Sequence, residues 1–580
     1  MSVLSIALIL SGCHSDDIVV RTRQVHTARE TVEEVANAYW EALMRRFPTM
    51  ATAVGDYRYN DRLEDYSESA RRRWRETLET LLERAQQAAL GDRDEIDRRL
   101  LVYTLRRTLE RMDVPDHLTP LNQMEAVHTA LPLVLVSQPF RNEDGFRAYV
   151  ARLRAFPRQV DQVIARMRQG MEAGYVSPRI IIEETIPQIR VHLVERVEDS
   201  VFYEPTAALD RLSESRRLTV RYSIERAIEE AVLPAYAELL QFVEQEYLSA
   251  CRDTVGLWDT PAGDEHYAIL ARYHTTTDLT PEEIHQIGLD EVTRIRAEMD
   301  ALRAEVGFAG ALDDFIAAMR TDPRFRAASR EEIIESYDAI LQRAFAELPR
   351  LFGNIPKADC VMKEIESFRA ASAPVAYYGP SSEDGSRPGY FYINTYAPRE
   401  RLTYTRESLT YHEAVPGHHL QLALDQENSN LLKFRRYAGY TAYVEGWALY
   451  AESLGAELGG YQDPWARFGR LTFDAWRACR LVVDTGIHYF RWPRQQAVRY
   501  MVQNAALAPI DIENEIDRYV AWPGQALAYK IGEQVFQRIR RDAEARLCAS
   551  FDIRAFHDRL LEGGAMPLSL LEERMSTLPP

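Results

Sequence analysis

Hydrophobic residues recur every three or four positions in one long segment of this chain after another, and this spacing constrains the fold more than any other feature. The first such segment, residues 27–46, has apolar side chains at Val32, Val35, Ala36, Tyr39, Trp40, Leu43 and Met44. Residues three and four apart share one face of an α-helix, so the spacing predicts an amphipathic helix. It recurs at 68–89, 94–111, 143–173, 220–249, 281–306 and 330–347. We therefore predict a mainly α fold.

The length of the chain bears on how it divides into domains. A chain of 580 residues is too long for one compact core, so we expect two domains or a helical body with two lobes. A polar stretch around residues 251–266 is the best boundary, which gives helical regions at 13–265 and 266–580. The formal net charge of −18 argues against a nucleic-acid partner and leaves no polybasic surface for anionic lipid.

The N-terminus resembles the signal of a bacterial lipoprotein. An apolar run at residues 3–10 ends in Leu-Ser-Gly-Cys at 10–13, which looks like a lipobox. The resemblance implies a signal peptide at 1–12, a lipid anchor on Cys13 as the only membrane contact, and a place in the cell envelope, in the periplasm or at the outer membrane. No Lys or Arg precedes the run, so a frayed apolar tail is the alternative reading.

The segment at 411–421 reads Tyr-His-Glu-Ala-Val-Pro-Gly-His-His-Leu-Gln and looks like an interrupted zinc-hydrolase motif. In the regular motif, His-Glu-x-x-His, two histidines four apart on one helix face bind the metal and the glutamate is the base. Here the fourth position after His412 is Pro416, which cannot bind metal. Proline removes a helical hydrogen bond and clashes with the preceding turn, so we predict a kink or a bulge at this point.

Two histidines compete for the position of the second ligand. If a bulge absorbs the two extra residues, His418 takes the place of the second histidine of the regular motif. In an unbroken helix His419 would share a face with His412, but about 10 Å would separate their α-carbons. That separation is awkward for ligand bonds of about 2 Å to one ion. We favour His418 and keep His419 as the alternative.

The third ligand is implied by a second resemblance. The string Val-Glu-Gly-Trp-Ala-Leu-Tyr-Ala-Glu at 444–452 looks like the third-ligand helix of gluzincin aminopeptidases, and carried over it makes Glu445 the ligand. Glu452 lies two turns further along the same face and would orient a histidine. Three protein ligands with one open position describe a catalytic zinc site, with one Zn²⁺ per chain. Zinc lowers the pKa of a bound water to about 7, and Glu413 would accept a proton from that water as general base.

Further strings at 480–488 and 522–532, together with the two already described, resemble the bacterial family known as domain of unknown function 885, which includes many predicted lipoproteins. Residues 56–61 and 273–281 extend the likeness over nearly the whole chain. The family implies a mostly helical fold similar to zinc oligopeptidases, and it does not imply a substrate. The expected architecture is therefore a two-lobed helical body like a zinc peptidase, with a small β-sheet beside the metal-binding helix.

Further residues in and near the family strings are candidates for assisting catalysis and for binding substrate. Tyr529 and His488 are the candidates for stabilising the oxyanion of a tetrahedral intermediate. A substrate carboxylate could be bound by Gln525, Lys530 or Arg477. For each of these residues, packing between helices is an equally good explanation.

Residues 363–398 lose the helical spacing, and runs at 365–368, 376–378 and 389–396 separated by a turn region predict short strands. Zinc peptidases commonly hold the substrate backbone on an edge strand beside the metal helix, so the last run, with Tyr392 and Asn394, is a candidate cradle. An ordinary hairpin that covers the core is an equally good reading.

These features together predict a lipid-anchored, zinc-dependent metallopeptidase, and the family resemblance implies that it cleaves short peptides in a channel between helical lobes. A zinc esterase or amidase is the alternative among hydrolases, because the same nucleophile attacks any activated carbonyl. An alternative from another class is a non-catalytic envelope lipoprotein that binds peptides in the same groove.

Overall fold

The structure is a computed structural model that describes residues 29–90, 94–365, 370, 373–381 and 387–577. The predicted signal peptide at 1–12 and the predicted anchor at Cys13 lie outside the described residues, as do residues 366–368 of one predicted strand. The fold is mainly helical, as the spacing predicted. None of the described helices is both long and apolar enough to cross a membrane.

Each helix predicted from the spacing of apolar residues is present. The first ten helices are α1 (Val32–Arg46), α2 (Pro48–Ala53), α3 (Glu68–Gln87), α4 (Asp94–Arg111), α5 (Val127–Ser137), α6 (Glu143–Ala173), α7 (Arg179–Arg190), α8 (Glu214–Ala227), α9 (Leu233–Phe242) and α10 (Leu248–Ala250). Short π-helical turns at 228–232 and 243–247 join α8, α9 and α10, so the predicted helix at 220–249 is continuous.

The second half of the chain is also built from helices. They are α11 (Gly263–Thr275), α12 (Pro281–Glu305), α13 (Leu312–Thr321), α14 (Arg330–Glu347), α15 (Arg406–Glu413), α16 (His418–Glu427), α17 (Lys433–Arg436), α18 (Thr441–Leu454), α19 (Pro464–His488), α20 (Arg494–Asn504), α21 (Pro509–Ala521), α22 (Ala528–Leu547), α23 (Ile553–Leu561) and α24 (Leu568–Ser576). The start of α12 illustrates why these segments begin where they do. The Thr280 side chain accepts the amide of Glu283, and the Glu283 carboxylate accepts the amide of Thr280, which satisfies two otherwise free helix donors.

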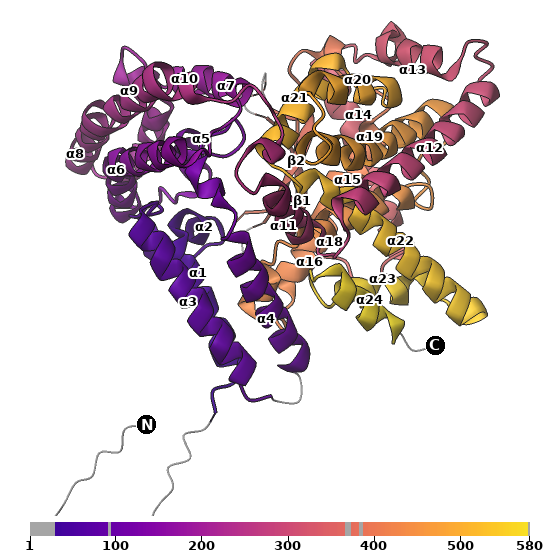
Figure 1. Cartoon of the computed structure of the whole chain (residues 1–580), viewed down its shortest axis with the longest axis horizontal. Coiled ribbons are helices and arrows are strands. Elements are labelled where there is room, and N and C mark those ends of the chain that lie inside the picture. Colours follow the sequence, from indigo (N-terminus) through magenta and orange to yellow (C-terminus); the bar gives the residue numbers. More distant parts are fainter. Residues whose placement is uncertain (1–28, 91–93, 366–369, 371–372, 382–386, 578–580) are drawn as a thin grey trace, which may run out of the picture.

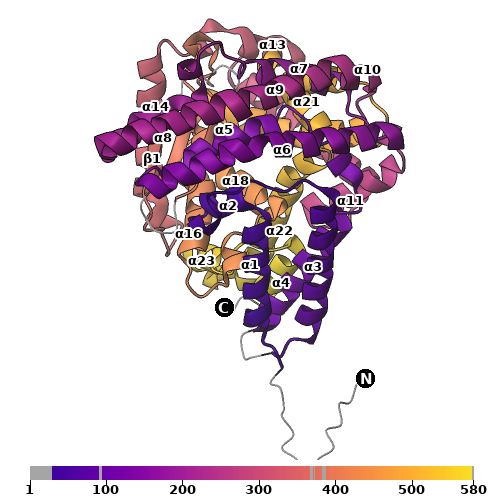
Figure 2. The same cartoon turned by 90° about the vertical axis from the view of Figure 1, so that its left-hand side faces the viewer.

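Two hydrophobic cores organise these helices. The smaller core draws on residues 121–251, from α5 to α10, which lie at the upper left of Figure 1 and cross the face seen in Figure 2. The larger core combines residues 255–575 with residues 32–105. The N-terminal helices therefore pack with the C-terminal half, as in the stacking of Trp40 on Tyr437 at a centroid distance of 5.2 Å. The division of the chain at residue 265 stays a prediction.

A small three-stranded sheet precedes α15, as predicted, but its first strand ends at Glu364, before the predicted run at 365–368 begins. It consists of β1 (Cys360–Glu364), β2 (Ala376–Gly379) and β3 (Gly389–Ile393) in the order β1-β3-β2. β3 runs parallel to β1, with Met362 opposite Phe391, and antiparallel to β2, with Tyr378 opposite Phe391. β3 is thus the central strand, and both of its edges are already hydrogen-bonded.

Candidate metal centre

The helix that carries the histidine motif is interrupted at Pro416, as the sequence predicted. α15 ends at Glu413 and α16 begins at His418. Across the break the amide of His419 donates to the carbonyl of Ala414 at 3.1 Å, one residue further back than in a regular helix. A Cβ on Gly417 would lie 1.8 Å from the carbonyl oxygen of His412, so only glycine fits this turn.

The interruption brings His412, at the end of α15, close to His418, at the start of α16. Their ring centroids lie 4.8 Å apart. Glu445 on α18 faces both rings: its Oε2 lies 3.5 Å from His412 Nε2 and 3.4 Å from His418 Nε2. One donor atom from each residue lies within 4.8 Å of the other two. The structure therefore brings together the three residues predicted as metal ligands.

The donor atoms of this trio suit a single zinc ion. Ligand atoms about 2.0–2.1 Å from an ion at tetrahedral angles lie about 3.3 Å from one another, close to the two separations that involve Glu445. Glu445 Oε2 is buried and makes no hydrogen bond, which is costly for a carboxylate oxygen unless something else satisfies it. The trio can thus hold a metal, and a cation would satisfy this orphaned oxygen.

The electrostatics of the site also favour a positive charge. Burial lowers the pKa of His412, but its contacts with Glu445 and Glu452 outweigh burial and raise the pKa to about 9. Burial raises the pKa of Glu445, but the charges of His418 and His412 and their contacts with its carboxylate hold it well below its usual range. A carboxylate that stays ionised in a buried place attracts a cation, and a metal ion would replace the proton on His412.

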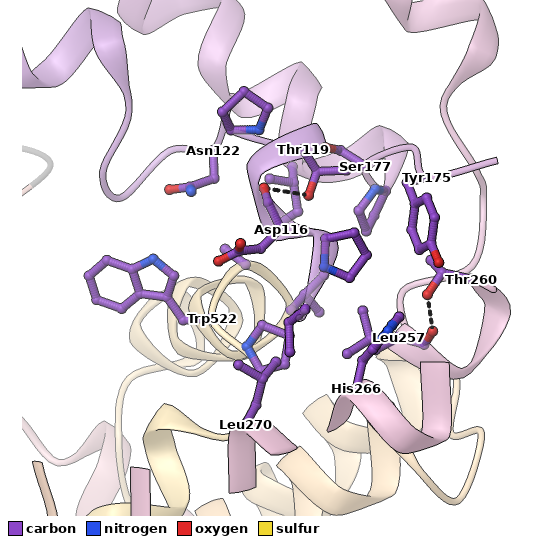
Figure 3. A pocket seen from close by; sticks show the side chains of 18 of the residues that line it. Asp116, Thr119, Asn122, Tyr175, Ser177, Leu257, Thr260, His266, Leu270 and Trp522 are labelled. Atoms are coloured by element: carbon purple, nitrogen blue, oxygen red, sulfur yellow. Dashed lines mark hydrogen bonds between the residues drawn. The ribbon is translucent and has the colours of Figure 1, made fainter. Parts of the chain in front are cut away.

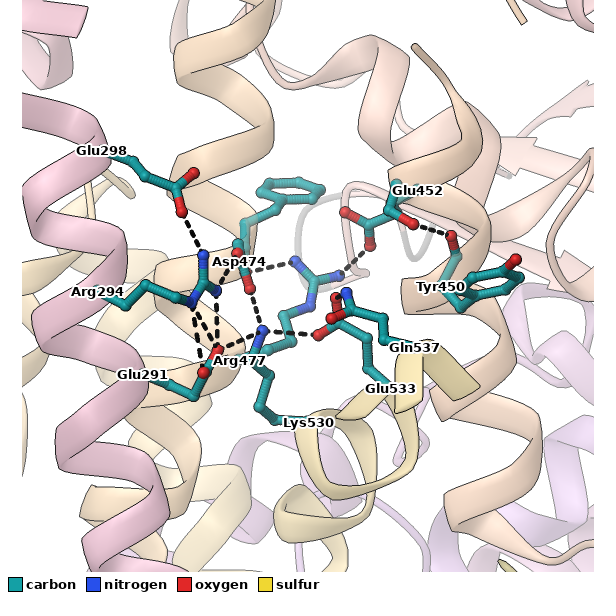
Figure 4. A network of polar contacts seen from close by, with 12 residues as sticks. Glu291, Arg294, Glu298, Tyr450, Glu452, Asp474, Arg477, Lys530, Glu533 and Gln537 are labelled. Carbon is teal, nitrogen blue, oxygen red and sulfur yellow. Dashed lines mark hydrogen bonds and ion pairs between the residues drawn. The ribbon is translucent and has the colours of Figure 1, made fainter. Parts of the chain in front are cut away.

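A second carboxylate holds the ring of His412. Glu452, two turns along α18 from Glu445, has its Oε1 2.9 Å from His412 Nδ1. Arg477 of α19 lies behind it, with Nη2 3.5 Å from the same Oε1, and Figure 4 shows the two side chains facing each other. Because Nδ1 is engaged by Glu452, Nε2 is left to face Glu445. The orienting role predicted for Glu452 fits this geometry.

Glu413 directly follows His412 and ends α15. Burial raises the pKa of its carboxyl, while the nearby His412 and His418 oppose that rise. A raised pKa brings a carboxylate closer to the value at which it accepts and returns protons efficiently near neutral pH. Its position and its environment therefore suit the base predicted from the sequence.

His419 points to another partner. Its Nδ1 lies 3.0 Å from the hydroxyl of Tyr378 on β2, and its ring is fully buried. Burial lowers its pKa to about 4. It does not belong to the trio of converging donor atoms, so the geometry favours His418 as the second ligand.

The close packing of α18 on α22 brings Tyr529 to the site. Gly446, the neighbour of Glu445, faces Gly532 on α22, and a Cβ on Gly446 would lie 2.5 Å from Gly532 Cα. Without side chains between them, the two backbones approach closely. Tyr529 precedes Gly532 by three residues, and its ring lies parallel to that of His412 at 6.5 Å.

Gln525 is linked to Tyr529 through an arginine that the sequence did not single out. Nη2 of Arg518, on α21, donates to Gln525 Oε1 at 2.6 Å and to the Tyr529 hydroxyl at 3.3 Å. Tyr529 therefore lies beside His412 of the metal trio, and Gln525 is linked to Tyr529 through Arg518; the roles expected for both stay predictions.

His488 and Lys530 are engaged elsewhere, and we correct the roles expected for them. His488 Nδ1 accepts the amide of Leu257 at 3.1 Å, and Nε2 lies 2.9 Å from the carbonyl of Tyr519. Burial also lowers its pKa to about 3. Lys530 is 1% exposed, and its ammonium contacts Asp474, Glu533 and Glu291 in the network of Figure 4. Neither side chain has a free group to offer a substrate.

Arg477 is likewise turned away from its expected role as a binder of substrate carboxylate. It is 3% exposed, and its guanidinium faces Glu452. Its cation also lies 4.3 Å from the ring centroid of Trp476. In this structure Arg477 supports Glu452.

The predicted cradle strand needs a correction too. β3 is central, so a peptide cannot add to either of its edges. Asn394 donates to the carbonyls of Ala370, Ala373 and Pro374, which uses its amide inside the fold. The ring of Tyr392 stacks on Tyr377 at 4.6 Å. β2, which has β3 as its one hydrogen-bonded neighbour among the described strands, offers the edge that β3 lacks.

Four residues near Tyr529 were not predicted. Arg480 on α19 and Arg518, Glu515 and Tyr519 on α21 form one polar group. Burial by itself would raise the pKa of Glu515, but Arg518, Arg480 and the Tyr519 hydroxyl hold it at about 2. No local sequence motif indicates this polar group, because α19 and α21 come into contact only in the folded chain.

A cavity of about 540 Å³ opens between the smaller core and the larger one. Asn122 and Tyr175 line it from one side and Leu270 and Trp522 from the other, as Figure 3 shows. Gln525 also lines the cavity, so the cavity reaches the group that includes Tyr529. Its volume is that of a typical small-ligand site.

Comparisons with known proteins place the chain in a family. Residues 48–575 match the family described as "Bacterial protein of unknown function (DUF885)", so the chain belongs to that family, as its strings indicated. A crystal structure titled as "the putative lipoprotein from Colwellia psychrerythraea" is 29% identical, with a TM-score of 0.89 over 94% of this chain and 98% of that chain. No curated protein matches the chain.

A second solved structure shares the fold. It is described as "a putative lipoprotein of unknown function from Shewanella oneidensis" and is 19% identical, with a TM-score of 0.71 over 94% of this chain and 100% of that chain. At this identity the likeness concerns the fold alone.

Proposed function

We propose that this member of the DUF885 family is a zinc-dependent metallopeptidase that hydrolyses short peptides. His412, His418 and Glu445 would hold one Zn²⁺ per chain, and Glu413 would act as general base. The observation that carries the proposal is the convergence of three donor atoms, with Glu445 Oε2 buried and without a hydrogen bond between two histidine nitrogens 3.4 and 3.5 Å away.

Bound zinc would polarise a scissile carbonyl and make a coordinated water more acidic. The protein's own groups would then handle the protons and the charge. Glu413, next to His412, would take a proton and later return it to the leaving amine. Tyr529 would donate its hydroxyl proton to the oxygen on which negative charge develops, while Arg518 holds that hydroxyl in place at 3.3 Å.

The cavity supports a short peptide as the substrate. It lies between the two cores, and Gln525, one of the residues that line it, is linked through Arg518 to Tyr529. A space of about 540 Å³ accommodates a few residues of an extended chain and excludes a folded protein. Such a peptide could form backbone hydrogen bonds with the open edge of β2, which lies beside α15.

We further propose that the protein works in the cell envelope, anchored through Cys13. The support is the lipobox at residues 10–13 and the description of the two structural relatives as putative lipoproteins. Labelling with radioactive palmitate in the native bacterium tests the anchor, and Cys13→Ser should abolish the label.

Elemental analysis of three variants tests the metal site. Protein purified without added metal should contain close to one zinc per chain. His418→Ala should lose the metal, whereas His419→Ala serves as a matched control and should keep it. Glu413→Gln should keep the metal and lose hydrolysis, which a peptide library read by mass spectrometry detects together with the cleavage position.

The outcomes separate the alternatives. If zinc is absent and cannot be restored, the enzyme proposal fails and a peptide-binding lipoprotein is the better description. If zinc is present and only ester substrates are cleaved, the protein is a zinc esterase. An active Glu413→Gln variant would remove Glu413 from the role of base.

A further inference from the structure

Arg480 has an unusual environment for a buried arginine. It is 2% exposed, and its cation lies 4.4 Å from the ring centroid of Trp476 and 4.3 Å from that of Tyr529. Hydrogen bonds from a guanidinium lie in its plane, so contacts with the ring faces leave its edges to find partners. Nε donates to the Tyr519 hydroxyl at 2.9 Å and Nη2 to Glu515 at 3.0 Å.

The remaining nitrogen, Arg480 Nη1, has no hydrogen-bond partner. Among the described residues it is the one terminal guanidinium nitrogen that is both buried and unpartnered. An unsatisfied buried donor costs free energy, and more so when it is charged. A ligand that accepts a hydrogen bond at this point would remove that cost.

The charge of the group points to the kind of ligand. Arg480 and Arg518 share one carboxylate, Glu515, among the described residues. Arg518 gives its other nitrogen to the neutral Gln525 and Tyr529. Arg480 is buried and the Arg518 side chain is 13% exposed, so these two cations with one anion leave a positive charge that a further anion would balance. Arginine pairs best with planar carboxylate or phosphate groups.

The distance between Arg480 and the metal trio indicates which kind of anion would bind. Tyr529 contacts both His412 of the metal trio and Arg480. Its ring centroid is 6.5 Å from that of His412 and 4.3 Å from the Arg480 cation. The cation is therefore no more than about 11 Å from the His412 ring, while each extended peptide residue spans about 3.5 Å. A carboxylate one or two residues beyond a bond held at the metal would reach Arg480.

We propose that Arg480, assisted by Arg518, binds the C-terminal carboxylate of a peptide, so that the protein removes one or two residues from the C-terminus. This inference rests on the proposed peptidase function and deepens it. The carboxylate would accept from Arg480 Nη1, and Glu515 would keep both guanidiniums in place. An aminopeptidase would have no use for a cation at this position.

Matched substrates test the proposal without any variant. A peptide with a free C-terminal carboxylate and the same peptide as its C-terminal amide should differ in kcat/KM by roughly 10- to 100-fold, the worth of a charged hydrogen bond. The loss should lie mainly in KM, because the carboxylate is far from the reacting carbonyl. Equal hydrolysis of the acid and the amide would overturn the proposal.

Variants then locate the effect. Arg480→Met keeps an unbranched side chain between Trp476 and Tyr529 and should lose the preference for the acid, while Arg480→Lys should retain part of it. Arg494→Met is the matched control: Arg494 is a half-buried arginine paired with Asp517, and its loss should leave the acid-to-amide ratio unchanged. An unchanged ratio in folded Arg480→Met, as judged by circular dichroism, would overturn the assignment.

Binding separates this inference from the proposed function. If zinc-loaded wild-type protein hydrolyses no peptide, the proposed function fails, and calorimetry with the acid and the amide still tests Arg480. Tighter binding of the acid that is lost in folded Arg480→Met and reduced in Arg480→Lys supports the carboxylate site, whereas equal binding of the acid and the amide by the wild-type protein overturns it. If Arg480→Met does not fold, the wild-type comparison and Arg480→Lys decide.

Discussion

The contact between Gly446 and Gly532 offers the sharpest test of how packing positions the site. Gly446→Ala would place a methyl group 2.5 Å from Gly532 Cα and from its carbonyl carbon. Carbon atoms that are not bonded pack at about 3.5–4.0 Å. The obstacle is backbone on both sides, so α18 and α22 must move apart by about 1 Å.

The expected magnitude follows from that displacement. Overpacking of this kind costs about 1–3 kcal/mol, and the better helix propensity of alanine returns about 1 kcal/mol. The net loss of stability is therefore small. The effect on activity is larger, because a misplacement of about 1 Å between Glu445 and Tyr529 can lower the rate about 100-fold.

Three measurements check this prediction. Peptide hydrolysis should fall in Gly446→Ala whichever helix moves, and the dissociation constant of zinc shows whether α18 carried Glu445 away. The midpoint of thermal unfolding should change little. Gly439→Ala is the control, because a Cβ on Gly439 meets nothing within 4 Å. If Gly446→Ala matches Gly439→Ala in activity and in zinc affinity, the close approach of the two helices does not set the site.

The remaining predictions concern the support of the metal and the pH dependence of stability. Glu452→Ala should weaken zinc binding about 10- to 100-fold, because His412 loses the carboxylate on its Nδ1; unchanged affinity in equilibrium dialysis would contradict this. Chelation should lower the thermal midpoint of the wild type by removing about 2.7 kcal/mol of ligand stabilisation at a hundredfold excess of zinc over its dissociation constant, and should leave His418→Ala unchanged. Burial raises the pKa of Asp484 to about 7, against hydrogen bonds from Tyr267 and the amide of Gly524. The folded chain therefore keeps a proton that the unfolded chain loses near pH 4, so stability should fall as pH rises from about 4 to 7. Asp484→Asn, whose amide oxygen can accept both hydrogen bonds, should flatten this part of the pH profile of unfolding, and an unflattened profile would show that Asp484 titrates normally.

The helices and the break between His412 and His418 could be predicted because their signals are local, whereas Glu445 was expected only from the resemblance of its string to a third-ligand helix. The spacing of apolar residues decides each helix, and Pro416 announces the interruption that brings His418 to His412. The order of the strands could not be predicted, because β1 is close in sequence to β2 but pairs with β3. Because β1 pairs with β3, the strand predicted to lie at the edge is central, and it cannot hold a substrate backbone as expected.

The errors at Lys530 and His488 have a common cause. Both residues were chosen for their chemistry, and both are occupied by groups distant in sequence: Lys530 by Glu291 and Asp474, His488 by the amide of Leu257. Arg480 is the opposite case. It lies three residues after Arg477 on α19, and only the packing of α19 against α21 and α22 decides that Arg477 supports Glu452 while Arg480 keeps a free nitrogen.

The proposed catalytic and substrate-binding groups come from separate helices, and this arrangement determines whether substitutions affect activity or stability first. Glu413 ends α15, Glu445 lies on α18, Tyr529 on α22 and Arg480 on α19, so no single loop fixes their spacing. Their relative positions depend on the same side-chain packing that stabilises the larger core. Cores keep a fold through changes that shift helices by about 1 Å, whereas catalysis does not tolerate such shifts. Substitutions between these helices should therefore abolish hydrolysis well before they unfold the chain.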